Sequence, residues 1–414
     1  MSTRKEKIPT VRFRAFSEPW FQNQLSEVAE FSKGRGYSKK DIQPQGTPII
    51  LYGRLYTKYE SVISNIDTYA NMEKNSVISE GGEVIIPASG ESAAEISRAS
   101  CVTDGGVILG GDINIVKPHE SLDSSFIAIT LSNGSQQREL SKRAQGKSVV
   151  HLHNSDLKAV KLFYPSYEEQ FAIGSLFRNI DDLLASYKDN LINYQSLKAT
   201  MLSKMFPKAG QTVPEIRLDG FEGEWKVQSL KELARFSKGN GYTKSDLVNS
   251  GNEIILYGQL YTNYQTVISM VNTFVLETRE KSVISKGGEV VVPASGESAE
   301  DISRASVIEK SGVIIGGDLN IIYPDENKVD SIFLALTISN GSQQKELIKR
   351  AQGKSVVHLR NNDLEKVVLH YPSMEEQQAI GACFSNLDNL INSYQEKISQ
   401  LETLKKKLLQ DMFI

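Results

Sequence analysis

The chain repeats itself at a spacing of about 206 residues, and this duplication limits its possible folds more than any other feature. The segment LYGRLYT from Leu51 recurs as LYGQLYT from Leu256, an offset of 205. The segment RAQGKSVVHL from Arg143 recurs unchanged from Arg350, an offset of 207. Solenoid and propeller repeats have periods of about 20–50 residues. The chain is therefore two copies of a domain-sized unit, and we expect a pseudo-two-fold relation between them.

Each copy contains a globular part and a long helix. The globular part is a run of short segments rich in Val, Ile and Tyr, separated by Gly-Gly, Ser-Gly and Asn-Gly turns, which predicts a mixed, sheet-based α/β (α+β) domain. A proline, Pro165 or Pro372, ends each globular part. The predicted boundaries are 1–165 for the first globular domain, 166–206 for the first helix, 207–215 for a linker, 216–372 for the second domain and 373–414 for the second helix.

Both helical segments have apolar residues at a spacing of seven, which is typical of a coiled coil. The predicted contact positions are Ile173, Ile180, Leu183, Tyr187, Tyr194, Met201, Ile380, Leu387, Leu390, Tyr394, Leu401 and Leu408. A further row (Phe177, Leu184, Leu191) widens the stripe and indicates contact with something else as well. Ser166 and Glu169 form a candidate capping box. We expect the two helices to pair antiparallel; packing of each helix against its own domain is the alternative.

Composition and charge exclude several classes of protein. Hydrophobic residues make up 40% and charged residues 23%, as in a soluble globular protein, and no apolar run reaches the length of a membrane span. The start, MSTRKEKIPT, lacks the apolar core of a signal peptide, so we expect a cytoplasmic location. A net charge of −3 argues against indiscriminate binding of polyanions but leaves room for a locally basic face.

Comparing the two copies also shows which candidate catalytic or metal-binding residues are repeated. Cys101 and Cys383 correspond to Val307 and Leu176, so both are expected to be apolar core positions, and no metal site is expected. Gly-Lys-Ser at Gly146 resembles the end of a phosphate-binding loop but lacks the glycine five residues earlier. There is no Pro-Pro dipeptide, hence no Asn/Asp-Pro-Pro-aromatic methyltransferase motif. We therefore expect a non-catalytic chain; a hydrolase built on Ser89 and Ser295 is the enzyme alternative.

With catalytic and metal-binding motifs set aside, the distinctive polar residues lie in repeated loops rich in hydrogen-bond donors. Arg, Lys, Gln and Asn side chains read base edges in the major groove, and Lys, Arg and Tyr also bind phosphate. Two similar modules suit duplex DNA, which presents two similar sites. The candidate DNA-binding residues are Lys33, Arg35, Tyr37, Lys39, Arg54, Tyr56, Lys58, Gln136, Gln137, Arg138, Lys142, Arg143 and Lys147 in the first copy, and Lys238, Asn240, Tyr242, Lys244, Gln259, Tyr261, Asn263, Gln343, Gln344, Lys345, Lys349, Arg350 and Lys354 in the second.

The arrangement as a whole resembles a known family. Each helix is preceded by a Tyr-Pro-Ser-x-Glu-Glu-Gln motif, YPSYEEQ from Tyr164 and YPSMEEQ from Tyr371, and ends in Met-Phe. The segment VPEIRLDGFEGEW from Val213 lies between the copies, and Asn-Gly-Ser-Gln-Gln occurs near the end of each domain. Over essentially its whole length, the chain resembles the specificity subunit of a type I restriction–modification system.

That resemblance implies a function. The globular units would be target recognition domains that read the two halves of a split site in double-stranded DNA, and the helices would set the spacer. Two methyltransferase subunits, which methylate adenine, and restriction/translocase subunits would be the partners, and S-adenosylmethionine, ATP and Mg²⁺ would belong to them. The two domains are unusually alike for the family, which predicts a near-palindromic site. A duplicated coiled-coil scaffold that does not read DNA is the alternative.

Overall fold

The computed structural model describes residues 8–146, 149–353 and 356–414, which form two compact units. Unit 1 consists of Met1–Lys188 and Glu396–Ile414, and unit 2 of Asp189–Gln395. The two longest helices, α7 (Tyr167–Lys204) and α14 (Met374–Asp411), each have 38 residues and contribute one half to each unit. Each helix is about 57 Å long at 1.5 Å per residue. Among the described helices, none has both the length and the apolarity needed to cross a membrane.

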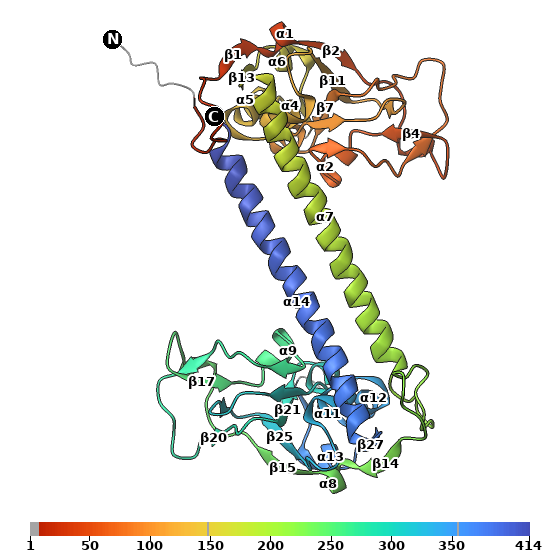
Figure 1. Ribbon diagram of the computed structural model, residues 1–414, viewed down its shortest axis with the longest axis vertical. Helices are drawn as coiled ribbons and strands as arrows, with labels where there is room; N and C mark the ends of the chain where they lie inside the picture. Colours follow the sequence, from red (N-terminus) through yellow and green to blue (C-terminus); the bar gives the residue numbers. More distant parts are fainter. Residues whose placement is uncertain (1–7, 147–148, 354–355) are drawn as a thin grey trace. The chain divides into compact units, whose positions relative to one another are not determined.

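The globular part of unit 1 is a mixed α/β domain, as the sequence predicts (Figure 1). Its strands are β1 (Phe21–Gln24), β2 (Ala29–Lys33), β3 (Ile42–Gln43), β4 (Thr47–Ile50), β5 (Val62–Ile63), β6 (Tyr69–Ala70), β7 (Glu83–Pro87), β8 (Ser89–Gly90), β9 (Ser100–Val102), β10 (Ile108–Leu109), β11 (Ile113–Pro118), β12 (Val150–His151) and β13 (Lys161–Tyr164). Its helices are α1 (Leu25–Val28), η1 (Lys39–Asp41), α2 (Arg54–Thr57), α3 (Ala93–Ile96), α4 (Ser124–Leu131), α5 (Gly134–Arg143) and α6 (Asn154–Lys158).

Unit 2 repeats this order of elements. Its strands are β14 (Lys226–Ser229), β15 (Ala234–Lys238), β16 (Leu247–Val248), β17 (Asn252–Ile255), β18 (Val267–Ile268), β19 (Phe274–Val275), β20 (Val283–Ile284), β21 (Glu289–Pro293), β22 (Ser295–Gly296), β23 (Ser306–Ile308), β24 (Ile314–Ile315), β25 (Leu319–Pro324), β26 (Val357–His358) and β27 (Val368–Tyr371). Its helices are α8 (Leu230–Leu233), η2 (Lys244–Asp246), α9 (Gln259–Thr262), α10 (Ala299–Ile302), α11 (Ser331–Ile338), α12 (Gly341–Arg350) and α13 (Asn361–Leu364).

A five-stranded sheet forms the centre of each globular part. Its order is β2-β11-β7-β9-β5 in unit 1 and β15-β25-β21-β23-β18 in unit 2, antiparallel except for the last pair. The middle strands, β7 and β21, are buried along their whole length, which explains their runs of Val and Ile. A smaller sheet, β10-β4-β6-β3 or β16-β19-β17-β24-β20, is built by the segment that follows the first strand of the large sheet.

The apolar helix α4 links the sheet of unit 1 to the long helices. Seven of its eight residues are buried, so it is surrounded by protein on all sides. Its N-terminus is capped by Asp123, whose carboxylate accepts a hydrogen bond from the backbone N–H of Phe126 at 2.8 Å. Gln170 on α7 is fully buried and accepts a hydrogen bond from the backbone N–H of Asp123 at 3.0 Å. The second copy repeats this contact with Gln377 and Asp330 at 2.9 Å.

Glu169, one residue earlier in the same motif, makes a buried ion pair. The sequence predicts that Glu169 caps α7, but both of its carboxylate oxygens accept hydrogen bonds from Arg12, at 2.6 and 2.7 Å. Arg217 and Glu376 form the same pair in unit 2, at 2.7 and 2.6 Å. Such bidentate pairs are among the strong hydrogen-bonding arrangements. In unit 2 the backbone N–H of Glu376 also donates to the Ser373 hydroxyl at 3.4 Å. The Glu-Glu-Gln motif therefore joins each long helix to the start of its own globular part.

Each unit also buries the far end of the other long helix. In unit 1, Phe413, just after α14, is 6% exposed, and its ring centroid lies 5.9 Å from those of Phe126 and Phe177. In unit 2, Phe206, just after α7, lies 5.9 Å from Phe333. The Met-Phe that ends each helical segment is thus a core element and not a frayed terminus.

Within each unit the two helix halves run antiparallel. In unit 1, Asp181 on α7 pairs with Lys405 on α14, and Lys188 pairs with Glu402 at 2.7 Å, so residue numbers rise on one helix as they fall on the other. In unit 2, Lys198 pairs with Asp388, and the rings of Tyr194 and Tyr394 lie 5.5 Å apart. The predicted antiparallel pairing is therefore confirmed.

Two of the predicted contact positions on the helices are wrong. Leu183 and Leu390 are 40% and 42% exposed, whereas Leu184 and Ile391, the next residue on each helix, are 7% and 9% exposed. Spacing by seven fixes rows of residues but not which two rows form the contact, and the row expected to be accessory lies in it. Of the other predicted positions, Ile173, Ile180, Ile380 and Leu387 are buried, and Tyr187, Tyr194, Met201, Tyr394, Leu401 and Leu408 are half-buried.

Candidate functional site

Three loops of unit 1 meet at one end of the large sheet, because neighbouring strands there are antiparallel. Strand β2 ends at Lys33 and β7 ends at Pro87, where β11 begins at Ile113. The loops after β2 and before β11 touch through their backbones: a side chain on Gly34 would lie 2.0 Å from the carbonyl oxygen of Gly110. We call this end of the sheet, residues 33–36, 88–92 and 110–112 with β12, the edge surface.

The segment after β7 is fixed to the same surface. Ala88 donates its backbone N–H to Asp112 at 2.7 Å, and the hydroxyl of Ser89 donates to the Asp112 carboxylate at 3.2 Å. Gly90 leaves no room for a side chain, since a Cβ would lie 2.5 Å from a methyl group of Ile96. Unit 2 has the same contacts, with the hydroxyl of Ser295 at 3.3 Å from the Asp318 carboxylate. These repeated contacts make the turn after β7 a rigid feature of both units.

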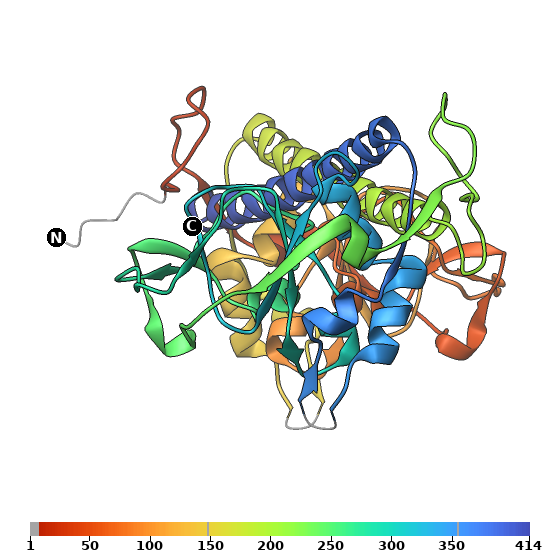
Figure 2. The same ribbon diagram turned by 90° about the horizontal axis from the view of Figure 1, so that it is seen from below.

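A narrow hairpin completes the edge surface. Gln145 and His151 exchange backbone hydrogen bonds of 3.0 and 2.8 Å, and β12 pairs with β8. The side-chain amide of Asn154, which follows β12, donates to the carbonyl of Ser32 at 2.9 Å and so joins the hairpin to the loop after β2. In Figure 2 the hairpin strands point away from the long helices of their unit.

The edge surface carries exposed ionisable side chains. In unit 1 these are Lys33, Arg35, Glu91 and His151. In unit 2 they are Lys238, Glu297 and His358, and the neutral Asn240 takes the place of Arg35; all are exposed. The cations among them have no ion-pair partner in the described parts of the chain. Of the predicted donors, Lys33, Arg35 and Lys238 therefore lie where they can meet a ligand, whereas the side-chain amide of Asn240 donates to the carbonyl of Lys281 at 2.9 Å.

Tyr37 and Tyr242, predicted in the same loops, are hydrogen-bonded within their own units. The hydroxyl of Tyr37 donates to the carbonyl of Asn71 at 3.1 Å, and that of Tyr242 to the carbonyl of Glu277 at 3.1 Å. Tyr242 is 6% exposed, and the guanidinium of Arg279 lies 4.3 Å from its ring. Both tyrosines hold the smaller sheet of their unit in place. The neighbouring lysines, Lys39 and Lys244, are exposed.

The guanidinium of Arg54 is hydrogen-bonded within its own unit. Its guanidinium donates to Asp67 at 2.9 Å, to Glu60 at 2.8 Å and to the carbonyl of Asn65 at 2.7 Å, and its side chain is 9% exposed. Its counterpart Gln259 accepts from the backbone of Leu256 at 2.8 Å and donates to Thr273 at 2.7 Å. Both side chains would have to break these bonds to read a base. Lys58 and Asn263, predicted beside them, are exposed, and Lys58 lies 3.1 Å from the Asp67 carboxylate.

Tyr56 and Tyr261 lie next to the edge surface. A Cβ on Gly90 would lie 4.0 Å from the ring of Tyr56, and the rings of Tyr52 and Tyr56 are 6.2 Å apart. Burial raises the pKa of Tyr56, with further contributions from Tyr52 and the negative charge of Glu91. The pKa of Tyr261 is raised by burial, Tyr257 and Glu297 in the same order. Each tyrosine therefore stays a neutral phenol beside an exposed glutamate.

The third predicted donor group lies on and just after helix α5 in unit 1 and helix α12 in unit 2. Some of its members face the interior and others face solvent. Gln136 and Gln343 are 1% and 3% exposed and face the interior. Arg143 and Arg350 pair with Glu139 at 2.8 Å and Glu346 at 2.6 Å. Gln137 and Gln344 are half-buried, and the exposed members are Arg138, Lys142, Lys345 and Lys349. Lys147 and Lys354 lie outside the described residues. The tertiary structure thus leaves a smaller set of accessible donors than the sequence predicts.

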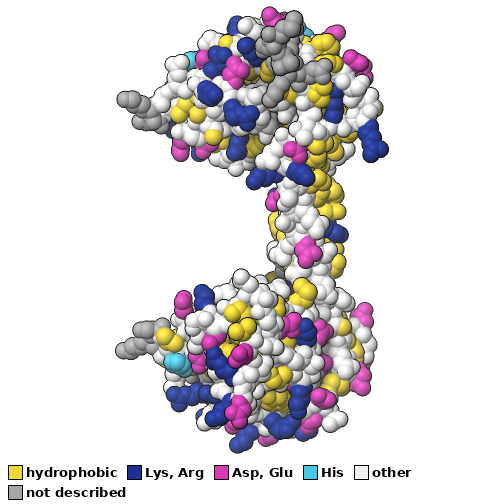
Figure 3. Space-filling view, turned by 90° about the vertical axis from the view of Figure 1, so that its left-hand side faces the viewer, with side chains coloured by type: hydrophobic (Ala, Val, Ile, Leu, Met, Phe, Trp, Pro, Cys, Tyr) yellow, Lys and Arg dark blue, Asp and Glu magenta, His cyan; other side chains and the backbone are white. Residues whose placement is uncertain are grey.

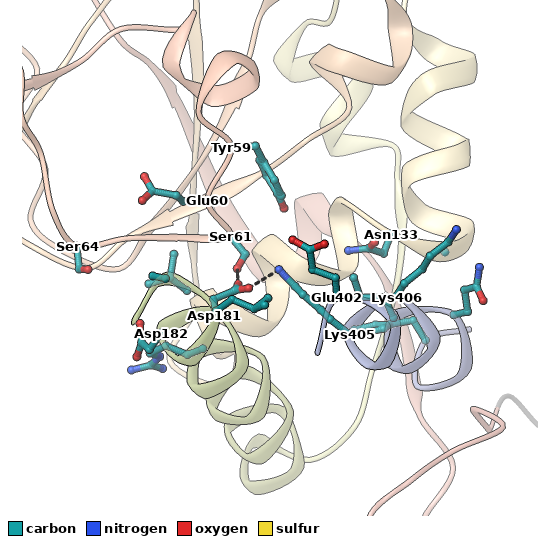
Figure 4. Close-up of a pocket in the computed structure, with 18 of the residues that line it drawn as sticks. Tyr59, Glu60, Ser61, Ser64, Asn133, Asp181, Asp182, Glu402, Lys405 and Lys406 are labelled. Carbon is teal, nitrogen blue, oxygen red and sulfur yellow. Dashed lines mark hydrogen bonds and ion pairs between the residues drawn. The ribbon is translucent and has the colours of Figure 1, made fainter. Parts of the chain in front are cut away.

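A charged groove of about 1110 Å³ lies within unit 1, between the β5 segment and the two helix halves (Figure 4). Asp181 is central to it: its carboxylate accepts from the hydroxyl of Ser61 at 3.0 Å and pairs with Lys405. Lys188 and Glu402 form a second pair on its rim. These contacts tie the helices to the sheet.

Two further observations bear on catalysis. Ser89, the nucleophile of the hydrolase alternative, donates its hydroxyl to a carboxylate and so clamps a turn. Within residues 8–146, 149–353 and 356–414, there is no group of three or more His, Cys, Asp or Glu side chains able to hold a metal ion. Cys101 is buried, and burial raises the pKa of its thiol to about 12, so it behaves as the apolar position that the repeat predicts.

Comparison with known proteins shows which family the chain belongs to. The type I restriction modification DNA specificity domain matches the chain twice, over residues 17–194 and 222–403, so each match contains one globular part and most of its helix. The chain belongs to this family, and its two globular parts are recognition domains. This agrees with the resemblance seen in the sequence and favours it over the scaffold alternative.

Two relatives match nearly the full length of the chain. The type I restriction enzyme MjaVIII specificity subunit of Methanocaldococcus jannaschii is 20% identical over 407 residues, covering 95% of this chain and 91% of the relative. A crystal structure of the type I restriction–modification system S subunit from M. genitalium superposes with a TM-score of 0.63 at 15% identity, covering 98% of this chain and 99% of that chain. The second comparison shows that the fold is shared.

Proposed function

We propose that this chain is the non-catalytic subunit that selects the DNA sequence in a type I restriction–modification complex. Each recognition domain reads one half of a split, near-palindromic site in double-stranded DNA, and partner subunits methylate adenine or cleave. The observation that carries the proposal is the edge surface, which occurs in both units with the same rigid loops and uncommitted cations. Loops on a fixed scaffold are a usual place for binding residues.

The charge of the edge surface suits a DNA backbone. The chain has a net charge of −3, so DNA affinity depends on local cations and on the partners. Each phosphate contact contributes about 0.9 to the slope of log affinity against log salt concentration. Lys33 and Arg35 in unit 1 and Lys238 in unit 2 are placed to make such contacts.

A binding experiment tests the DNA-reading role. The complex of this chain with its methyltransferase subunits is titrated with duplexes that carry the methylated site, at several salt concentrations. We expect the double substitution Lys33→Ala, Arg35→Ala to lower the salt slope by about 1.8. Lys161→Ala, an exposed lysine on the separate β1–β13 sheet, is the matched control and should leave the slope unchanged. A wild-type complex without sequence preference would refute the proposal, and equal slopes for both variants would remove these cations from it.

The helices offer matching docking sites for two copies of one partner. Leu183 and Leu404 are 40% and 46% exposed, and the ion pairs Asp181–Lys405 and Lys188–Glu402 bracket them in unit 1. In unit 2, Leu197 and Leu390 are 46% and 42% exposed. Figure 3 shows hydrophobic side chains at the surface of the helices. Apolar side chains that repeat on an otherwise polar helix surface are typical of a protein interface.

We therefore assign these leucine pairs to the two methyltransferase subunits, to which restriction/translocase subunits are added. S-adenosylmethionine, ATP and Mg²⁺ would bind to those partners, and the assembly would work in the cytoplasm, where the DNA is. Native mass spectrometry checks the assignment: Leu183→Asp with Leu404→Asp should remove one methyltransferase copy. The matched control is Ile192→Asp, because Ile192 is 62% exposed but its counterpart is Ser399. Two bound copies in the leucine variant would refute the assignment.

A further inference from the structure

Glu91 and its counterpart Glu297 are the unexpected charges on the edge surface. Both are exposed, and within the described residues neither carboxylate takes part in a hydrogen bond or an ion pair. A free carboxylate beside DNA phosphates lowers affinity, since like charges repel. Because this glutamate occurs in both units of a DNA-reading protein, we look for a ligand group that donates a hydrogen bond to it.

The backbone that carries Glu91 is rigid. Gly90, immediately before it, pairs with Val150 on β12 and has no room for a side chain. Ser92, immediately after it, caps α3: its backbone N–H donates to the Glu95 carboxylate at 3.1 Å, and its hydroxyl accepts from the Glu95 N–H at 3.3 Å. The backbone of the residue between them is thus held on both sides before any ligand binds, which reduces the backbone's share of the ordering cost of recognition.

Unit 2 fixes Glu297 by equivalent means. A Cβ on Gly296 would lie 2.5 Å from Ile302, and Ser298 and Asp301 cap α10 with hydrogen bonds of 2.6 and 3.1 Å. The capping residue differs between the units, Glu95 against Asp301, while the exposed glutamate is the same. The rigid turn and the free carboxylate are therefore both repeated.

The chemistry of Glu91 indicates which ligand group suits it. Lys33 and Arg35 lie on the same surface and suit phosphates, so the DNA backbone has other partners there. In the major groove, cytosine N4 and adenine N6 are amino donors, whereas guanine and thymine present acceptors. A carboxylate accepts hydrogen bonds from the amino groups of the first two bases and repels the acceptors of the other two. It therefore contributes specificity by attraction and by repulsion.

We propose that Glu91 and Glu297 are base-reading residues, each accepting a hydrogen bond from the exocyclic amino group of one cytosine or adenine in its own half-site. This inference rests on the proposed function and adds an acceptor to the Arg, Lys, Gln and Asn donors that the sequence predicts. Each glutamate selects an amino base at one position, and the two positions are equivalent in a near-palindromic site.

The test is a methylation map of the complex on a library with randomised half-sites. Glu91→Ala should reduce discrimination between amino and keto bases about five- to 150-fold at one position of one half-site. Glu297→Ala should do the same in the other half-site. The base lost from each consensus distinguishes cytosine from adenine.

A matched control separates base reading from a general charge effect. Glu300 is exposed on α10, three residues from Glu297 and outside the edge surface, so Glu300→Ala removes the same charge nearby. We expect it to leave every base preference unchanged. If Glu91→Ala and Glu297→Ala complexes methylate with wild-type preference at all positions, the base-reading role is refuted while the proposed function stands. If the wild-type complex shows no preference, the proposed function itself fails.

Discussion

Replacing Phe413 with alanine should destabilise unit 1 selectively. The ring is 6% exposed and contacts Phe126 and Phe177, both fully buried, so its loss leaves a cavity that the packed neighbours cannot easily fill. Removal of a buried phenylalanine side chain costs about 3–5 kcal/mol. In a unit of roughly 200 residues, each kcal/mol lowers the melting temperature by about 2–4 °C, which gives a shift of about 6–20 °C.

Hydrogen exchange measured by mass spectrometry separates the two units. Phe413→Ala should increase exchange in the buried strands β7 and β11, while β21 and β25 keep their protection. Phe206→Ala is the matched variant, because Phe206 is 4% exposed and fills the same place in unit 2. It should give the reverse pattern. Equal loss of protection in both units for either variant would show that the last residues of the helices are not independent core elements.

Three further predictions concern DNA reading. Arg54→Gln should lower the stability of unit 1 by about 1–3 kcal/mol, as expected for lost hydrogen bonds to charged groups, and leave the methylated sequence unchanged; a changed sequence would restore Arg54 as a reader. Methylation mapping should find two similar, inverted half-sites, because the two recognition domains carry matching edge surfaces, and unrelated half-sites would contradict this. Inserting four residues at matched positions of α7 and α14 lengthens each helix by about 6 Å. With about 3.4 Å per base pair, the spacer should grow by one to two base pairs, and an unchanged spacer would show that the helices do not set it.

The duplication, the two long helices and the family can be read from the residues alone. These features depend on local rules: turn residues between short β-prone segments, a proline before each helix, and apolar residues every seven positions. The Tyr-Pro-Ser-x-Glu-Glu-Gln motif is recognisable in the sequence, but its reasons are tertiary. Glu169 pairs with Arg12, and Gln170 holds the backbone of Asp123, two contacts that span 157 and 47 residues.

Which polar side chains remain free is decided by contacts between distant segments. Arg54 and Gln136 belong to residue types that read DNA, yet one is held by two carboxylates and the other is buried. Leu183 has the right spacing for the helix contact, but a spacing of seven cannot specify the rotation of the helix about its axis. Glu91 is an acceptor, so it is not among the donors that the sequence predicts. Its significance appears only when the antiparallel sheet brings the ends of β2 and β7 to the same edge, since composition records how many charges a chain has and folding determines which surface each of them occupies.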